Sequence, residues 1–204
     1  MMTRGPLARP GEREASHPDN WQGGNVEANL LLKALHFAAD KHRDQRRKDV
    51  HASPYVNHPV TVAQILSEIG GVDDVEVLIA AILHDTVEDT DTTIEELERE
   101  FGSRVARIVG EVTDDKTLSK AERKRLQIEN ARHISEEGAL VKIADKISNV
   151  QDVINNPPEE WDDKRRLEYL DWAEQVVKSC PVIGERLSVR FDEALSHGKA
   201  RLSI

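Results

Sequence analysis

Four polar side chains follow directly on an apolar run near the middle of the chain. The segment 80–89 reads Ala-Ala-Ile-Leu-His-Asp-Thr-Val-Glu-Asp. On a helix, His84 and Glu88 are neighbours one turn apart, and Asp85 and Asp89 form a second such pair. Because His84 and Asp85 are adjacent, their side chains diverge by about 100° and can reach one ion from two sides. Burying such groups is costly unless a cation or hydrogen bonds compensate them. We therefore interpret the segment as half of a metal site.

Two further residues, His58 and Asp145, complete a candidate set of metal ligands. Alone, His58 would fit a capping or packing histidine. Asp145 fits either a surface ion pair with Lys142 or Lys146 or the wall of a cavity. Two imidazoles and two carboxylates together favour a borderline-to-hard divalent ion such as Mn²⁺, Fe²⁺ or Zn²⁺. Such an ion lowers the pKa of a water molecule and polarises a phosphoryl group, which is the chemistry of phosphate-ester hydrolysis.

The composition excludes several classes of protein. The 204 residues carry a net charge of −10, which disfavours non-specific binding to nucleic acid. No segment approaches the roughly 18 apolar residues that a membrane span needs, so we expect no membrane association. Cys180 is the only cysteine. A single cysteine cannot form an internal disulfide bond, and it is typical of a small, buried hydrophobic residue. The absence of disulfides fits a reducing cytosol, so we predict a cytoplasmic protein.

Two spans gather positive charge within this acidic chain. The first, 41–48, holds five Lys and Arg residues against a single Asp, and the second, 116–125, holds five against a single Glu. Either span alone would suit a solvated helix face. Together they also suit a small anionic substrate, since cations close to the site offset its repulsion by an acidic protein.

The elements that must position these residues are all helical. Apolar residues recur at helical spacing and no sustained strand alternation appears, so we predict an all-α bundle of about eight to ten helices. Thr93 and Glu96 match a capping box. We expect residues 1–24 to form a disordered tail and residues 25–204 to form one domain. The expected helices lie at about 25–48, 58–69, 73–84, 93–101, 105–112, 119–132, 139–154, 161–179 and 181–196.

The order His, His-Asp, Asp in an all-α chain resembles the HD-domain phosphohydrolase superfamily. Segment 84–90 is similar to the HDxxED motif in the hydrolase half of the RelA/SpoT alarmone enzymes. The resemblance is greatest to the small single-domain, metazoan-type alarmone hydrolases and covers about residues 28–197. No room remains after residue 197 for a synthetase domain, so we expect hydrolysis alone. Further segments that match in order and spacing are 47–49, 55–59, 112–116 and 144–149.

The resemblance implies a role for each matching residue. The metal, usually Mn²⁺ in this family, would be held by His58, His84, Asp85 and Asp145. Glu88 and Asp89 would position and deprotonate the attacking water, which their spacing from the ligands also permits. The nucleotide and its phosphates would contact Arg47, Lys48, Asn149 and Tyr169, with Lys116 and Lys120 as further candidates for the distal phosphates.

The implied reaction is hydrolysis of the 3′-diphosphate of guanosine tetra- or pentaphosphate (ppGpp or pppGpp), giving GDP or GTP and pyrophosphate. The implied enzyme is therefore a Mn²⁺-dependent guanosine-3′,5′-bis(diphosphate) 3′-pyrophosphohydrolase. Two alternatives stay open: removal of the 2′-phosphate of NADPH or another phosphohydrolase activity of the same superfamily, and a nucleotide-binding sensor without catalysis. The metal, the preferred substrate and the oligomeric state are left open by the sequence.

Overall fold

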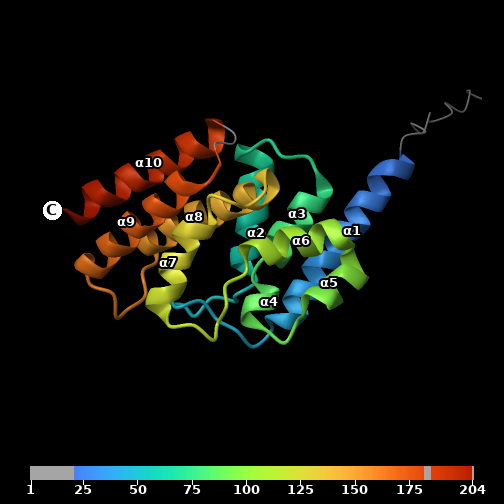
Figure 1. The fold of residues 1–204 in the computed structure, drawn as a ribbon, viewed down its shortest axis with the longest axis horizontal. Helices are drawn as coiled ribbons and strands as arrows, with labels where there is room; N and C mark the ends of the chain where they lie inside the picture. The colour runs from blue at the N-terminus through green and yellow to red at the C-terminus, as the bar shows by residue number, and fades with distance from the viewer. Residues whose placement is uncertain (1–20, 182–184, 204) are drawn as a thin grey trace, which may run out of the picture.

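The computed structural model describes residues 21–181 and 185–203, and these form helices joined by loops (Figure 1). The predicted all-α class is confirmed, since the described residues contain no strand beyond the isolated bridge between Arg46 and Pro54. None of the described helices has the length and apolar character needed to cross a bilayer. The elements are α1 (Trp21–Lys41), α2 (Asn57–Gln64), the π-helix η1 (Ile65–Ile69), α3 (Val75–Leu83), α4 (Thr86–Asp89), α5 (Ile94–Phe101), α6 (Ser103–Val112), α7 (Lys120–Asn130), α8 (Glu136–Asn155), α9 (Asp163–Ser179) and α10 (Glu185–Leu202).

Helix α8 is the central element of the bundle. It packs against α2, α6, α9 and α10. In Figure 1, α1, α3, α5 and α6 lie at one end of the molecule, and α9 and α10 lie at the other. Since α2 contacts both α3 and α8, these three helices bring together the segments that carry His58, His84 and Asp145.

The sequence around α8 explains why it is long and buried. Ser135 caps its first turn, where the side-chain oxygen accepts a hydrogen bond from Gly138 N at 3.1 Å. Ile143, Ile147 and Val150 are buried and repeat at helical spacing, so they form a continuous apolar stripe. The charged residues of α8 therefore occupy fixed positions beside a packed core.

Helix α3 leads directly into the His-Asp pair. Asp74 caps it by accepting hydrogen bonds from Glu76 N and Val77 N. The helix ends at Leu83, where the sequence pattern predicted His84, and the short α4 begins at Thr86. A turn at positions 84 and 85 therefore separates the two helices, and the short helix α4, which the sequence pattern did not predict, carries Glu88 and Asp89.

The prediction of one helix over residues 25–48 is wrong at its C-terminal end. Helix α1 stops at Lys41, and the following chain folds back on itself. Arg47 N donates to Ser53 O at 2.8 Å, and Tyr55 N donates to Gln45 O at 3.2 Å. These pairings satisfy backbone groups that a longer helix would have used internally. The second half of the first basic span therefore lies on a loop.

Several other boundaries differ from prediction. Of the predicted tail 1–24, residues 1–20 lie outside the described residues, and α1 already begins at Trp21. The last helix, α10, extends beyond the predicted end at Ser196 to Leu202. The predicted capping box is confirmed in its first half, because the Thr93 side chain accepts from Glu96 N at 3.2 Å.

Gly198 allows α10 to approach its neighbours closely, which gives a test of the packing. A Cβ atom at this position would lie 2.5 Å from Ile154 Cδ1 and 3.0 Å from Leu170 Cδ1. Overpacking of this kind costs about 1–3 kcal/mol, against a gain of about 1 kcal/mol from the better helix propensity of alanine. We expect Gly198→Ala to lower the free energy of unfolding by up to about 2 kcal/mol, measured by urea denaturation.

Gly110 in α6 supplies the matched control. It is exposed, and an added Cβ would meet only Ile94 Cδ1 at 3.5 Å, an ordinary van der Waals distance. Gly110→Ala should therefore raise the free energy of unfolding by about 0.5–1 kcal/mol. If both variants were stabilised equally, α10 would not be packed as closely against α8 and α9 as the structure has it.

Candidate functional site

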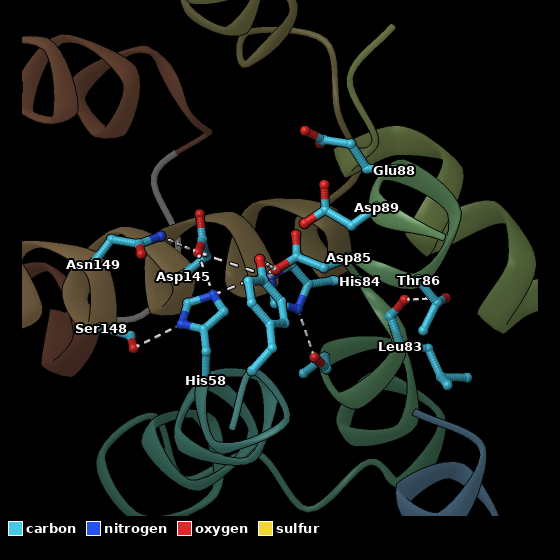
Figure 2. A network of polar contacts seen from close by, with 12 residues as sticks. His58, Leu83, His84, Asp85, Thr86, Glu88, Asp89, Asp145, Ser148 and Asn149 are labelled. Carbon is cyan, nitrogen blue, oxygen red and sulfur yellow. Dashed lines mark hydrogen bonds and ion pairs between the residues drawn. The ribbon is translucent and has the colours of Figure 1, made fainter. Parts of the chain in front are cut away.

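Three of the four predicted metal ligands converge on one point. Ligand atoms of His58, His84 and Asp145 all lie within 4.8 Å of one another. Nε2 of His58 is 3.1 Å from Asp145 Oδ1, and Nε2 of His84 is 3.8 Å from the same oxygen. Figure 2 shows the two imidazoles and the carboxylate turned toward one another from α2, the end of α3 and α8.

Asp85 joins this group from the turn after α3. Its Oδ2 lies 3.2 Å from His84 Nε2 and 3.6 Å from His58 Nε2, and it accepts a hydrogen bond from Tyr55 Oη at 2.7 Å. The structure therefore brings together all four predicted ligands. Burial raises the pKa of Asp85, but the imidazole of His84 outweighs burial and holds the pKa of this carboxyl below its usual value.

Both imidazoles are held from behind through their Nδ1 atoms. Nδ1 of His84 lies 2.8 Å from the carbonyl oxygen of Ala81, which can only accept, so this nitrogen donates. Nδ1 of His58 lies 3.1 Å from the Ser148 hydroxyl. Such contacts fix ring orientation and leave Nε2 of each ring available toward the centre of the group.

The residues fit a bound cation. Nε2 of His84 is buried and hydrogen-bonds to none of the described residues, although two carboxylate oxygens lie nearby. Burial lowers the pKa of His84, but Asp85 and Asp145 outweigh burial and hold it well above its usual value. The two carboxylates therefore stabilise a positive charge at the centre of the group. A cation bound among the two imidazoles and two carboxylates would also give Nε2 of His84 a partner.

Asp145 lies on a cavity wall and not on the surface. Its side chain is 14% exposed, and its Oδ2 accepts from Lys146 Nζ at 2.9 Å while its Oδ1 accepts from Asn149 Nδ2 at 2.5 Å. Burial raises the pKa of this carboxyl, but Lys146 and His58 outweigh burial and keep it well below its usual value. Of the two interpretations left open by the sequence, the structure therefore favours the cavity.

Glu88 and Asp89 project from α4 beside this group (Figure 2). Both line a cavity of about 190 Å³ that also contains the four candidate ligands. Lys116 forms ion pairs with both, with its Nζ 3.4 Å from Glu88 Oε1. Burial and the neighbouring carboxylate of Asp114 raise the pKa of Glu88, which suits a group that exchanges a proton.

A second cavity, of about 430 Å³, adjoins the first, and Arg47, Tyr55, Asp89, Lys116 and Asn149 line both. The larger cavity also contains the predicted substrate contacts Lys48 and Tyr169, together with the Trp161 ring. Its volume and its mixture of aromatic, basic and amide groups suit a nucleotide.

Arg47 is anchored at the boundary between the two cavities. It donates to Asp152 Oδ2 at 2.6 Å and to Asn149 Oδ1 at 3.0 Å, and it lies over the Tyr55 ring. These contacts come from α8 and from the loop before α2, so the guanidinium is fixed before any substrate arrives.

Among the described residues, Lys120 is the one predicted site residue that lines neither the metal cavity nor the nucleotide cavity. It lines a third cavity, of about 370 Å³, and its Nζ lies over the Trp161 ring. Lys116 and Tyr169 also line this cavity, so it is continuous with the site. The other basic residues of the span 116–125 have different surroundings. Arg123 and Lys124 line this third cavity, whereas Arg125 forms ion pairs with glutamates on the surface.

The sequence reasoning missed three residues that contact the ligands: Tyr55, Lys146 and Ser148. All three lie in segments 55–59 and 144–149, which matched the family, and this was a usable signal. Lys146 was considered only as a surface partner of Asp145, but its side chain is 6% exposed. Nothing in the local sequence distinguishes such a buried lysine from a solvated one.

Comparisons with known proteins identify the family of this chain. A family model described as "HD domain" matches residues 34–171. The guanosine-3′,5′-bis(diphosphate) 3′-pyrophosphohydrolase MESH1 of Homo sapiens is 54% identical over 171 residues, covering 84% of this chain and 93% of the human protein. The protein of the same name from Danio rerio is 58% identical over 168 residues, covering 80% and 93%.

A solved structure resembles the whole fold. It is described as a metazoan orthologue of SpoT that hydrolyses ppGpp and plays a role in starvation responses. The similarity has a TM-score of 0.80 with 44% sequence identity, and it covers 90% of this chain and 98% of that one.

Proposed function

We propose that this chain, which belongs to the HD-domain family and within it to the small metazoan-type guanosine-3′,5′-bis(diphosphate) 3′-pyrophosphohydrolases, removes the 3′-diphosphate of ppGpp or pppGpp. The products are GDP or GTP and pyrophosphate. The observation that carries the proposal is the nucleotide-sized cavity that opens onto His58, His84 and Asp145 and shares five lining residues with their cavity.

The side chains divide the work between binding and proton transfer. His58, His84, Asp85 and Asp145 hold a divalent ion, which when bound supplies Lewis-acid stabilisation of the phosphoryl group and acidifies water. Glu88 takes the proton of the attacking water, assisted by Asp89. The water oxygen joins the phosphorus next to the ribose, and the bond from that phosphorus to the 3′ oxygen breaks. The 3′ oxygen takes a proton from solvent while Glu88 releases its proton to solvent, so one water molecule is consumed overall.

The basic residues offset the charge of the substrate. Arg47 and Lys48 contact the nucleotide and its phosphates, while Asn149 and Tyr169 line the cavity near the sugar. Lys116, already paired with Glu88 and Asp89, stands where the two cavities meet and contacts phosphate oxygens. Burial raises the pKa of Tyr169 to about 12, so its hydroxyl stays protonated and can donate to the substrate.

The proposed resident ion is Mn²⁺, with Zn²⁺ or Fe²⁺ as alternatives. The support is the donor set of nitrogen and carboxylate oxygen without sulfur, which suits borderline-to-hard ions. A cytoplasmic location is also proposed, because the single cysteine, Cys180, is buried and reduced.

The activity is tested by stripping the purified protein of metal, restoring Mn²⁺, and assaying ppGpp and NADPH in parallel. The readout separates pyrophosphate from orthophosphate. Metal-dependent pyrophosphate from ppGpp is the expected result. Orthophosphate from NADPH alone would keep the site and change the substrate, and tight nucleotide binding without either product would indicate a sensor.

Lys48 gives a test of the nucleotide cavity. It lines this cavity but not the one around the metal ligands. Lys48→Ala should therefore raise KM for ppGpp about tenfold with little change in kcat, since a charge-assisted contact contributes about 1.5–3 kcal/mol and exposure reduces it. Arg43→Ala is the matched control, because Arg43 belongs to the same basic span but pairs with Asp40 on the surface. An unchanged KM for Lys48→Ala would remove this lysine from the cavity.

A further inference from the structure

Lys142 is a buried cation without a partner among the described residues. It is 6% exposed, and its ammonium forms no hydrogen bond or ion pair with the described residues. Lys146, one turn further along α8, pairs with Asp145 at 2.9 Å. The charges of Asp114 and Asp145 favour the ammonium, but neither carboxylate forms a hydrogen bond or an ion pair with it. Because a buried charge without such a contact is costly, a ligand in the cavity can supply the missing contact.

Lys142 opens onto the cavity of the metal ligands. It lines the 190 Å³ cavity together with His58, His84 and Asp145. Its position follows from the helix: Lys142 and Asp145 are three residues apart, so they share the face of α8 that forms the cavity wall. The missing partner can therefore be a ligand that enters this cavity.

The location of Lys142 identifies the part of the ligand that it faces. Arg47, Lys116 and Asn149 line both the nucleotide cavity and the metal cavity, whereas Lys142 lines only the metal cavity. A nucleotide whose 3′-phosphorus lies among the metal ligands has its nucleoside on the shared side. The phosphate farther from the ribose then extends toward the part of the metal cavity that the nucleotide cavity does not share, where Lys142 lies.

We propose that Lys142 binds the distal phosphate of the 3′-diphosphate and so selects a diphosphate over a monophosphate. This assignment rests on the proposed function, because it takes the leaving group to be pyrophosphate. Burial and the neighbouring Lys146 lower the pKa of Lys142. The negative charge of a bound phosphate offsets both effects, because it favours the charged form of the lysine.

The test compares wild type and Lys142→Met, each loaded with Mn²⁺, for binding of pyrophosphate and of orthophosphate by calorimetry. We expect Lys142→Met to bind pyrophosphate about 10- to 100-fold more weakly, as for loss of a charge-assisted hydrogen bond, while orthophosphate binding changes much less. KM for ppGpp should rise in parallel. Equal losses for both anions, or no loss for either, would overturn the assignment.

Three controls separate this result from a folding defect. Metal content should be unchanged and the thermal midpoint should not fall, because methionine fills a similar volume without a buried charge. Lys142→Arg, which keeps the charge, should recover part of the affinity for pyrophosphate, and it provides a second variant if Lys142→Met does not fold. Lys178→Met, which removes an exposed lysine of α9, should leave the affinity unchanged.

The outcomes also distinguish this assignment from the proposed function. If wild type does not hydrolyse ppGpp, the proposed function fails, but the calorimetric difference between pyrophosphate and orthophosphate still decides whether Lys142 binds the distal phosphate. If wild type hydrolyses ppGpp and Lys142→Met shows no preference between the anions, only the assignment of Lys142 fails.

Discussion

Replacing His84 with alanine should remove most of the bound metal and lower hydrolysis of ppGpp by at least about 1,000-fold. The loss is large because Lewis-acid stabilisation contributes several kcal/mol to the transition state, and each 1.36 kcal/mol corresponds to a factor of ten in rate. Nε2 of His84 is buried with no hydrogen-bond partner among the described residues, so no other role is evident for it. Elemental analysis and steady-state kinetics check the two effects together.

His36→Ala is the matched control, because His36 is an exposed histidine of α1 away from the site. It should keep both metal and activity. A His84→Ala protein that retained a full equivalent of metal but lost activity would contradict the assignment of His84 as a ligand. The metal would then be held by His58 and the two aspartates alone.

Replacing Glu88 with glutamine should keep the metal and lower kcat by about 100- to 10,000-fold, the usual contribution of a positioned general base. Glutamine has nearly the same shape and can still accept the hydrogen bond that Asp114 N donates to Glu88 Oε2 at 3.2 Å. It cannot take a proton. Loss of metal from this variant would make Glu88 a ligand and contradict the proposed role. Glu95→Gln, an exposed glutamate of α5, should leave both quantities unchanged.

The pH profile provides an independent readout of Glu88. Burial, with Asp114 and Asp85 nearby, raises its pKa above the usual value for glutamate. A general base acts only when deprotonated, so kcat/KM should rise with pH through this raised pKa and fall as the solution becomes more acidic. The acidic limb of the profile should therefore lie above the ordinary range of a glutamate, and it should disappear in Glu88→Gln. An unchanged limb in that variant would assign it to another group.

Local sequence predicted most of the helices because helix formation depends on neighbours three and four residues apart. The apolar stripe of α8 and the cap of α5 at Thr93 are examples, since each involves residues within one or two turns. The loop after Lys41 is the main error. Its Lys and Arg residues have good helix propensity, but the return of the chain from Ser53 to Arg47 provides backbone hydrogen bonds across the loop, and this tertiary arrangement overrides propensity.

The position of Asp145 shows what a single helix leaves undetermined. The sequence placed it at the edge of an apolar stripe, where surface and cavity were equally good interpretations. Packing of α2 and α3 against α8 buries that edge and brings His58 and His84 onto the same carboxylate. The sequence could not supply this, because the contact joins three segments that are far apart in the chain.

The sequence alone therefore determined the all-α class, the residue types of the candidate site and, through the family resemblance, their roles. The tertiary structure decided which charges are buried and what they face. Lys142 and Lys146 look alike in the sequence, yet one pairs with Asp145 and the other opens unpaired onto the cavity. The physical reason is that the energy of a charge depends on its solvation and on partners distant in sequence, and both are fixed only when the helices pack.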